Sequence, residues 1–196
     1  MKPNHQTVAR VIARSFLHYP LMLYAFEGKS EEQRLALINR LFDKCVTAAE
    51  IYGGVIITPD ELGAVIWLPG NHFQLTLLNE IRSGMALIPL QVGIKPTLRL
   101  MNHDAQSEGW IKKHAPASMG YIWNIGVLPE ARGKGYSRLL MDQSIEQMRK
   151  LGLTECWLKT EDAKNVTIYQ KLGFTLMNEM KVKSSGINSW ALHKAI

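Results

Sequence analysis

Residues 125–138 combine the residue types that bind an anion, because an apolar strand leads through a glycine-rich, basic loop into the start of a helix. Gly133 and Gly135 allow positive φ angles, and without a Cβ they let the backbone approach a ligand closely. Backbone N–H groups left unpaired at a helix N-terminus attract negative charge. The pattern therefore predicts a receptacle for a diphosphate. The other basic and hydroxyl side chains of the loop are Arg132, Lys134, Arg138 and Ser137, the last expected at the N-cap or in the first turn.

The same segment has a simpler interpretation, because a Gly-Lys-Gly turn between a strand and a helix often serves only as a connection. Two other phosphate motifs are excluded by spacing. The chain has no GxxxxGK followed by Ser or Thr, so a nucleoside-triphosphate loop is not indicated. The GxGxxG dinucleotide pattern also fails, since Arg138 occupies the place of its last glycine.

Three segments together resemble the GNAT superfamily of N-acetyltransferases. Arg132–Ser137 resembles its acyl-CoA loop, in which a Gln or Arg is followed by two residues, a Gly, one residue and a Gly or Ala. The preceding Tyr121–Val127 resembles the fourth strand of the family. Asn165–Tyr169 and Lys171–Phe174 resemble the Asn…Tyr…Gly-Phe signature that follows the fifth strand. Loop, helix, strand and signature occur in the family's order and spacing.

The close match covers roughly Gly120–Phe174, whereas residues 1 to about 115 match only in outline. Ser137 departs from the family's usual Gly or Ala. Its small hydroxyl fits the same space and can bond a phosphate oxygen itself, so we expect binding to survive.

The resemblance implies acetyl-CoA as the cosubstrate. The loop would hold the pyrophosphate, backbone groups of Ile125 and Val127 would pair with the pantetheine amides, and Asn165 would bond the pantetheine arm. Tyr169 would protonate the departing thiolate, since a phenol is neutral at pH 7. Tyr169 could instead be a core aromatic, but it follows Asn165 by four residues and so shares its helical face. The implied cofactor-binding residues are Ile125, Gly126, Val127, Arg132, Gly133, Lys134, Gly135, Tyr136, Ser137, Arg138, Asn165 and Tyr169.

Acyl transfer also needs a deprotonated amine, and freeing an alkylammonium at pH 7 costs about 4.6 kcal/mol. Members with a similar helical insert often read Leu-Glu-Thr at the end of the fifth strand, where this chain places Lys159. A charged lysine cannot replace a carboxylate base, so Glu161 is the candidate base, with a solvated turn carboxylate as the alternative. His103 and His114 precede the fourth strand, and we expect each to be a surface or capping residue.

The predicted function is therefore an acetyl-CoA-dependent N-acetyltransferase that moves an acetyl group to a primary amine by direct attack in a ternary complex. A covalent route is not indicated, because Cys156 has no histidine partner in its motif.

The identity of the acceptor stays open, with a small-molecule amine favoured. Lys159 would favour an anionic acceptor if it lies in the cleft. Two alternatives remain: a catalytically silent acyl-CoA-binding or sensory module, and an RNA-associated acetyltransferase. Trp67 and Trp123 could line the acceptor pocket or fill the core.

The composition fits a soluble globular protein. The 196 residues suit one domain over residues 1–196, with 46% hydrophobic and 20% charged residues. Most of the net charge of +6 lies after residue 131, where eleven Lys and Arg face six Asp and Glu. This surplus suits a polyanionic cofactor, whereas a nucleic-acid partner is not favoured, because no Lys/Arg run or interleaved aromatic residues occur. Cys45 and Cys156 match no metal or redox spacing and are expected to be reduced core thiols.

The sequence also carries signals that bear on the location of the protein and on its assembly. The apolar stretch Phe16–Phe26 is interrupted by His18 and Pro20, and no stretch approaches the roughly 20 apolar residues of a membrane span. We therefore expect a cytoplasmic protein. A homodimer is possible if Ser189–Lys194 forms an edge strand that pairs between copies.

The elements that must position these residues follow from periodicity and turn signals. They predict an α/β fold: a single-domain, GNAT-like mixed β-sheet flanked by helices, with a helical insert before the fourth strand. Residues 1–7 are barely long enough for the family's first strand, which is either missing or supplied differently. The predicted helices are Val8–Phe16 (broken by Pro20), a helix capped by Ser30 and Gln33 that runs to Gly53, two or three helices in Gln74–Lys113 interrupted near Gly84 and Pro96, Tyr136–Leu151 and Ala163–Leu172. The predicted strands are Val55–Thr58 and Gly63–Leu68 as a hairpin, Tyr121–Leu128, Glu155–Thr160, Phe174–Lys183 and Ser189–Lys194.

Overall fold

The computed structural model describes residues 3–196, and a six-stranded mixed sheet in the order β1-β2-β3-β4-β6-β5 runs through it. β3 and β4 are parallel neighbours, and every other neighbouring pair is antiparallel. The strands are β1 Gly54–Ile57, β2 Gly63–Pro69, β3 Met119–Val127, β4 Glu155–Thr160, β5 Thr175–Lys181 and β6 Asn188–Ala195.

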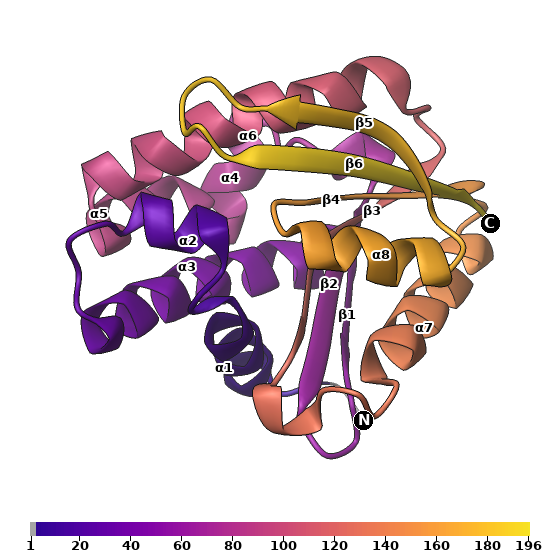
Figure 1. The fold of residues 1–196 in the computed structure, drawn as a ribbon, viewed down its shortest axis with the longest axis horizontal. Coiled ribbons are helices and arrows are strands. Elements are labelled where there is room, and N and C mark those ends of the chain that lie inside the picture. The colour runs from indigo at the N-terminus through magenta and orange to yellow at the C-terminus, as the bar shows by residue number, and fades with distance from the viewer. Residues whose placement is uncertain (1–2) are drawn as a thin grey trace.

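Helices cover both faces of this sheet (Figure 1). Within the part of the chain that is described, no helix has both the length and the apolar character needed to cross a membrane. The α-helices are α1 His5–Phe16, α2 Pro20–Ala25, α3 Glu31–Tyr52, α4 Leu77–Ser83, α5 Ile88–Val92, α6 Ile94–His114, α7 Tyr136–Lys150 and α8 Ala163–Lys171. Short 3-10 turns, η1 Gly70–His72, η2 Met85–Leu87 and η3 Pro129–Ala131, join some of these elements.

β2 is apolar along its length because it is buried on both faces. Ala64 and Ile66 pack into the core formed with α1, α2 and α3, whereas Val65 and Trp67 pack into a second core with α7. Successive side chains of a strand point to opposite faces, so a strand between two helical layers needs apolar residues at every position.

The C-terminal half of the sheet is also covered on both faces. Ile111 of α6 packs with Tyr121 and Trp157 on one face. On the other face Tyr169 of α8 packs with Leu158 and neighbouring residues of the α7 core. Helices α6 and α8 therefore lie on opposite sides of β4, which brings residues from distant parts of the chain to the end of that strand.

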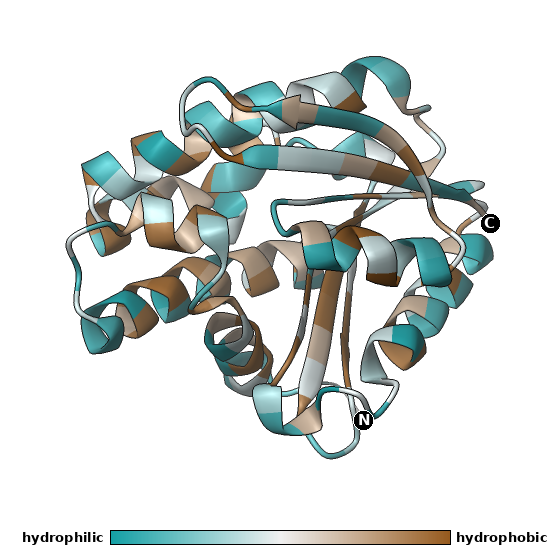
Figure 2. Cartoon of the chain, in the orientation of Figure 1, coloured by the Kyte–Doolittle hydropathy of each residue, from teal (hydrophilic) through white to brown (hydrophobic). Residues whose placement is uncertain are grey.

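The two halves of the sheet run in different directions. In Figure 1, β1 and β2 run up the view, whereas β4, β6 and β5 run across it. Figure 2 shows hydrophobic residues along β1 and β2 and hydrophilic residues over much of the outer surface of the helices. The divergence begins within the β3–β4 pair, where the functional residues predicted from the sequence are concentrated.

Most of the predicted elements are confirmed. The β1–β2 hairpin forms, Glu155–Thr160 is a strand with the predicted bounds, and Ser30 and Gln33 form a reciprocal capping box at the start of α3. Helices α4, α5 and α6 lie between β2 and β3, so the predicted helical insert is present. Among residues 3–196 no strand precedes α1, and the family's first strand is not seen there.

The predicted interruption near Pro96 is present: it lies at Gly93, whose φ is +99°, and Pro96 itself is in the first turn of α6, where a missing N–H is tolerated. Two details of the prediction are wrong. Pro20 does not end the first helix, which stops at Phe16; it begins α2. Ser189–Lys194 is not an edge strand, because β6 lies between β4 and β5, and it presents no open edge to a second copy.

Candidate active site

The parallel pair β3 and β4 separates part of the way along its length. Paired residues run from Met119 with Glu155 to Ile122 with Leu158. Beyond that point β3 continues to pair with β2 alone, and Lys159 of β4 pairs with β6 alone. The two strands therefore diverge, and the divergence leaves the end of β3 with one edge that β4 does not cover.

The glycine-rich loop lies between β3 and α7. Gly133 and Gly135 have φ angles of +79° and +81°, and a Cβ at either position would meet no atom within 4 Å. Backbone conformation, not crowding, is thus what favours glycine here. Gly135 is the N-cap of α7 and offers no side chain to the first-turn N–H groups, so these remain available to an anion. Ser137 lies in the first turn and is not the N-cap.

The charged side chains of the loop are exposed, namely Arg132, Lys134 and Arg138. Arg138 donates a hydrogen bond to the carbonyl of Lys171 at 3.4 Å, and the Tyr136 hydroxyl bonds to Asp60 in the β1–β2 turn. The loop is thereby tied to α8 on one side and to the hairpin on the other.

Gly126 was predicted as a cofactor-binding residue, and the structure also gives it a steric role. A Cβ at this position would lie 2.7 Å from Cβ of Ser15 in α1, which is closer than real Cβ contacts. The absence of a side chain therefore lets α1 pack directly on β3. Gly126 and Val127 do not line the cavity described next, whereas Ile125 does.

A central cavity of about 440 Å³ begins where β3 and β4 separate and extends under the helical insert. Ile125, Asn165 and Tyr169 line it, and so do Lys159 and Glu161 at the end of β4. Five residues predicted from separate segments are therefore brought to one cavity. The loop residues Arg132–Ser137 and Arg138 lie outside it, near its β3 end along the chain.

Tyr169 and Asn165 come from successive turns of α8, as the four-residue spacing predicts. Tyr169 is 8% exposed, and burial raises the pKa of its phenol further above the usual value, with the Glu161 charge acting in the same direction. Its hydroxyl is therefore protonated at neutral pH. Asn165 Nδ2 donates to Thr160 Oγ1 at 3.2 Å, which anchors this side chain to the end of β4.

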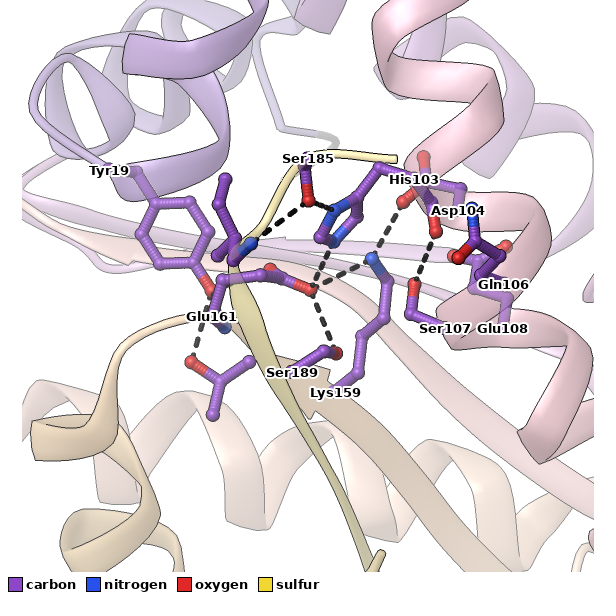
Figure 3. Close-up of polar contacts among 12 residues, drawn as sticks. Tyr19, His103, Asp104, Gln106, Ser107, Glu108, Lys159, Glu161, Ser185 and Ser189 are labelled. Atoms are coloured by element: carbon purple, nitrogen blue, oxygen red, sulfur yellow. Dashed lines mark hydrogen bonds and ion pairs between the residues drawn. The ribbon is translucent and has the colours of Figure 1, made fainter. Parts of the chain in front are cut away.

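Glu161 is the centre of a buried polar network (Figure 3). Its Oε1 accepts hydrogen bonds from Lys159 Nζ at 3.0 Å, Ser189 Oγ at 3.2 Å and His103 Nε2 at 3.2 Å. Its Oε2 accepts from the Tyr19 hydroxyl at 2.9 Å, and its backbone N–H donates to the same hydroxyl. One carboxylate thus connects β4, β6, α6 and the segment between α1 and α2.

The environment of Glu161 fixes its charge. Burial alone would raise the pKa of this carboxyl, but the Lys159 ammonium and the hydrogen bond from His103 hold it down to about 2. Glu161 is therefore an anion at neutral pH, and a carboxylate of such low pKa is a weak proton acceptor. Its predicted role as the base stays a prediction.

Two alternatives considered from the sequence are wrong. Glu161 is not a solvated turn carboxylate, since it is 6% exposed. His103 is not a surface or capping residue either: it is fully buried, and its Nδ1 bonds to Ser185 Oγ at 2.8 Å. His114 does lie at the exposed end of α6, where it stacks on Trp110.

Lys159 lies in the cleft, as considered from the sequence, but its charge is already paired. Its Nζ donates to Asp104 Oδ1 at 2.7 Å and to Glu161 Oε1 at 3.0 Å. Desolvation would lower the pKa of this ammonium, yet the nearby carboxylates raise it above its usual value. Lys159 therefore stays protonated and neutralises acidic neighbours.

The cavity is also lined by four polar residues that were not predicted from the sequence: Asp104, Glu108, Asn124 and Tyr19. Asp104 and Glu108 lie one turn apart on α6, and this spacing is the signal by which they could have been found. Burial, with the Asp104 charge, raises the pKa of Glu108 to about 8, and Tyr121 donates to its Oε1 at 3.2 Å. Asn124 Oδ1 is buried and has no hydrogen-bond partner in the described chain.

The remaining candidates lie in the core, except for Trp123. Trp67 is 1% exposed and donates to Gln147, whereas Trp123 does line the cavity. Cys45 and Cys156 are free, buried thiols, as expected, and burial raises the pKa of both.

Comparisons with known proteins agree with this geometry. A sequence model of the Acetyltransferase (GNAT) family matches residues 100–174. An uncharacterized N-acetyltransferase of Schizosaccharomyces pombe is 24% identical over 178 residues, a match that covers 87% of this chain and 70% of that protein. The mycothiol acetyltransferase of Geodermatophilus obscurus is 34% identical over 73 residues, or 34% of this chain. The match spans only about a quarter of that enzyme, 24% of its length.

A solved structure supports the same fold. The Drosophila melanogaster polyamine N-acetyltransferase, which catalyses the formation of N-acetylagmatine, superposes with a TM-score of 0.60. The superposition covers 97% of this chain and 94% of that one at 14% identity, so it shows likeness of fold.

The diverging parallel strands, the glycine-rich loop and these matches define one class of protein. The family model over residues 100–174 and the N-acetyltransferase relatives support membership of the GNAT superfamily of N-acetyltransferases. GNAT acetyltransferases in general use acetyl-CoA as the acetyl donor.

Proposed function

We propose that this protein transfers an acetyl group from acetyl-CoA to a primary amine by direct attack in a ternary complex. One observation carries the proposal. The central cavity joins the separated β3–β4 pair to a wall that holds Asn165 and Tyr169 and to a group of carboxyl side chains. Donor and acceptor could therefore meet in one cavity.

The residues present fit CoA. The uncapped N-terminus of α7, with Gly133 and Gly135 at positive φ, suits a pyrophosphate. The edge of β3 that β4 leaves uncovered suits the amides of pantetheine, which would pair with backbone groups of Ile125 and Val127. Acetyl-CoA would supply an acetyl group activated as a thioester. The residues proposed to hold it are Ile125, Gly126, Val127, Arg132, Gly133, Lys134, Gly135, Tyr136, Ser137, Arg138, Asn165 and Tyr169.

The charge of the cavity supports an amine acceptor. Its lining includes four carboxyl groups, Glu80, Asp104, Glu108 and Glu161, and one ammonium, Lys159. Because Lys159 is paired with Asp104 and Glu161, the excess is negative and favours a cationic acceptor over the anionic one considered from the sequence. The Drosophila melanogaster polyamine N-acetyltransferase, which has a similar fold, acts on an amine.

The proposed reaction uses the chain's own residues for proton transfer. The acceptor nitrogen loses a proton and forms a bond to the acetyl carbonyl carbon as the carbon–sulfur bond breaks. Tyr169 donates its phenolic proton to the departing sulfur and is reprotonated from solvent. Glu161 is the base suggested by the sequence, and Glu108 is a second candidate, because a pKa of about 8 suits proton transfer near neutral pH.

The experiment is an acetyl-transfer assay with purified protein, acetyl-CoA and a panel of primary amines, amino acids and peptides. Release of CoA thiol would be followed together with the mass of the acetylated product. An amine-dependent mass increase with one CoA released per product supports the proposal. Tight CoA binding without turnover on any amine would instead identify the catalytically silent acyl-CoA-binding module.

A further inference from the structure

The central cavity has two chemically different halves. Near β3 and β4 it is lined by the polar residues of the active site. Under the helical insert its lining is largely apolar and comes from α2, α3, η2, α5 and the first half of α6. Met22, Phe42, Met85, Ile88 and Leu100 represent this apolar half.

The apolar half reaches the surface. Leu77 of α4 and Met101 of α6 line the cavity, yet they are 70% and 60% exposed. Leu98 lies one turn before Met101 on α6 and is also exposed, although it does not line the cavity. Exposed apolar residues at the mouth of a cavity mark a binding surface for an apolar group.

The polar half offers a place for one cationic head. Asp104 Oδ1 accepts from Lys159, and within the described chain its Oδ2 accepts no hydrogen bond from a side chain. The buried Oδ1 of Asn124 also lacks a partner there. An unpaired buried acceptor is costly, and an ammonium N–H would satisfy it.

We infer that the acceptor is a primary amine attached to an apolar body, such as an alkylamine or arylalkylamine. Its ammonium would lie beside Asp104 and Asn124, and its apolar body would lie along Met85, Ile88 and Leu100. The inference rests on the proposed function and names the acceptor class of that site.

A polyamine suits the cavity less well. Its second ammonium would enter the apolar half, where an ion loses water and most lining residues offer it no partner. Among the lining residues of α3, α4 and α5, the carboxylate of Glu80 is the one acidic group that could receive it. The two acceptor classes therefore differ in the group that they place at the far end of the cavity.

The first test compares octylamine with 1,8-diaminooctane, which have the same chain length but differ in the terminal group. We expect kcat/KM at least about tenfold higher for octylamine, and an increase of about fourfold per methylene from butylamine to octylamine. Calorimetric titration of each amine into the CoA-bound protein gives the affinity without turnover and should rank the amines in the same order. An equal or higher kcat/KM for 1,8-diaminooctane would overturn the inference.

The other outcomes separate the inference from the function. Acetylation of amino acids or peptides but not of alkylamines would overturn the inference and leave the proposed function in place. Neither CoA binding nor acetylation of any amine would overturn the proposed function, and the inference with it.

A matched pair of variants tests the position of the apolar body. Met101→Lys places a cation at the mouth of the cavity, whereas Leu98→Lys places one on the same exposed face of α6 outside the lining. We expect Met101→Lys to lower kcat/KM for octylamine about tenfold, with unchanged CoA affinity, and Leu98→Lys to change neither by more than about twofold. Equal losses in the two variants would contradict the proposed path of the acceptor.

Discussion

Lys159 and Glu161, two residues apart at the end of β4, form a buried ion pair with 3.0 Å between Nζ and Oε1. The two charges neutralise each other, so the pair adds no net charge to the cavity. The negative excess of the cavity is therefore carried by Asp104 of α6 and Glu80 of α4, because Glu108 keeps its proton at neutral pH. This distribution of charge underlies both the acceptor proposal and several of the predictions.

Glu161→Gln should destabilise the fold at neutral pH. The carboxyl has a pKa of about 2 in the folded protein and an ordinary value of 4.5, so its ionisation favours the folded state above pH 4.5. We expect a loss on the order of 3 kcal/mol at pH 7. Because the unfolded chain binds the proton first, the stability contribution disappears as the pH falls from about 4.5 to 2, and the two proteins should converge there.

Urea unfolding at pH 7 and at pH 3 measures this difference. The control is Glu179→Gln on β5, an exposed carboxylate, which should change the free energy of unfolding by less than about 0.5 kcal/mol. A Glu161→Gln protein as stable as Glu179→Gln at pH 7 would contradict the network.

Gly135→Ala should weaken CoA binding through the backbone. Gly135 and Gly152 both have positive φ, +81° and +74°, and a Cβ added at either position would have open space around it. Alanine should therefore cost about 1 kcal/mol of stability at either site. Only Gly135 caps α7 at the loop, so we expect the Kd for CoA to rise about tenfold in Gly135→Ala and to stay unchanged in Gly152→Ala. Calorimetric titration distinguishes these results, and equal CoA affinities would argue against the loop as the pyrophosphate site.

Tyr169→Phe should remove the proton donor while leaving CoA in place. The hydroxyl of Tyr169 is protonated at neutral pH, and burial raises its pKa further above the usual value. We expect kcat to fall about 100-fold or more, with CoA affinity changed by less than about twofold. Steady-state kinetics and calorimetry measure the two quantities. A variant with full kcat would show that the departing thiolate is protonated by another group.

Glu108→Gln should alter both stability and the pH dependence of the reaction. With a pKa of about 8, folded Glu108 keeps its proton at pH values where the unfolded chain, at 4.5, has lost it. The native carboxyl therefore costs stability as the pH rises from 4.5 to 8, and Gln does not titrate. Thermal unfolding should show the variant gaining stability relative to the parent protein across that range.

If Glu108 is also the base, kcat of the parent protein should rise through pH 8, and the Glu108→Gln variant should lack this rise. Glu161→Gln provides the comparison, because its carboxyl does not titrate near pH 8. An unchanged pH profile of kcat in Glu108→Gln, together with a large loss of kcat in Glu161→Gln, would indicate that Glu161 is the base, as predicted from the sequence.

The features of the fold that depend on neighbouring residues were predicted well from the sequence. The capping residues Ser30 and Gln33, the glycines of the loop and the four-residue spacing of Asn165 and Tyr169 each act within a few residues. The edge position of Ser189–Lys194 was wrong because strand order depends on long-range pairing, which periodicity does not encode.

The active site was predicted in part for the same reason. Tyr19 bonds to Glu161 across 142 positions of the chain, and His103 bonds to it across 58. No spacing in the sequence brings these residues together, so a solvated Glu161 stayed open as the alternative to a base. Asp104 and Glu108 did carry a signal, but a pair of carboxylates on one helix turn is usually a solvated face until tertiary packing buries it.

The binding of CoA along the separated β3–β4 pair is tested most directly by thermal unfolding with acetyl-CoA, free CoA and ATP. ATP shares the nucleotide and the polyphosphate but lacks pantetheine, so it separates the proposed site from general anion binding. At ligand concentrations near 100 times Kd, we expect both CoA species to raise Tm by about 5–10 °C and ATP to leave it unchanged. No rise with saturating CoA, or an equal rise with ATP, would contradict the proposed site.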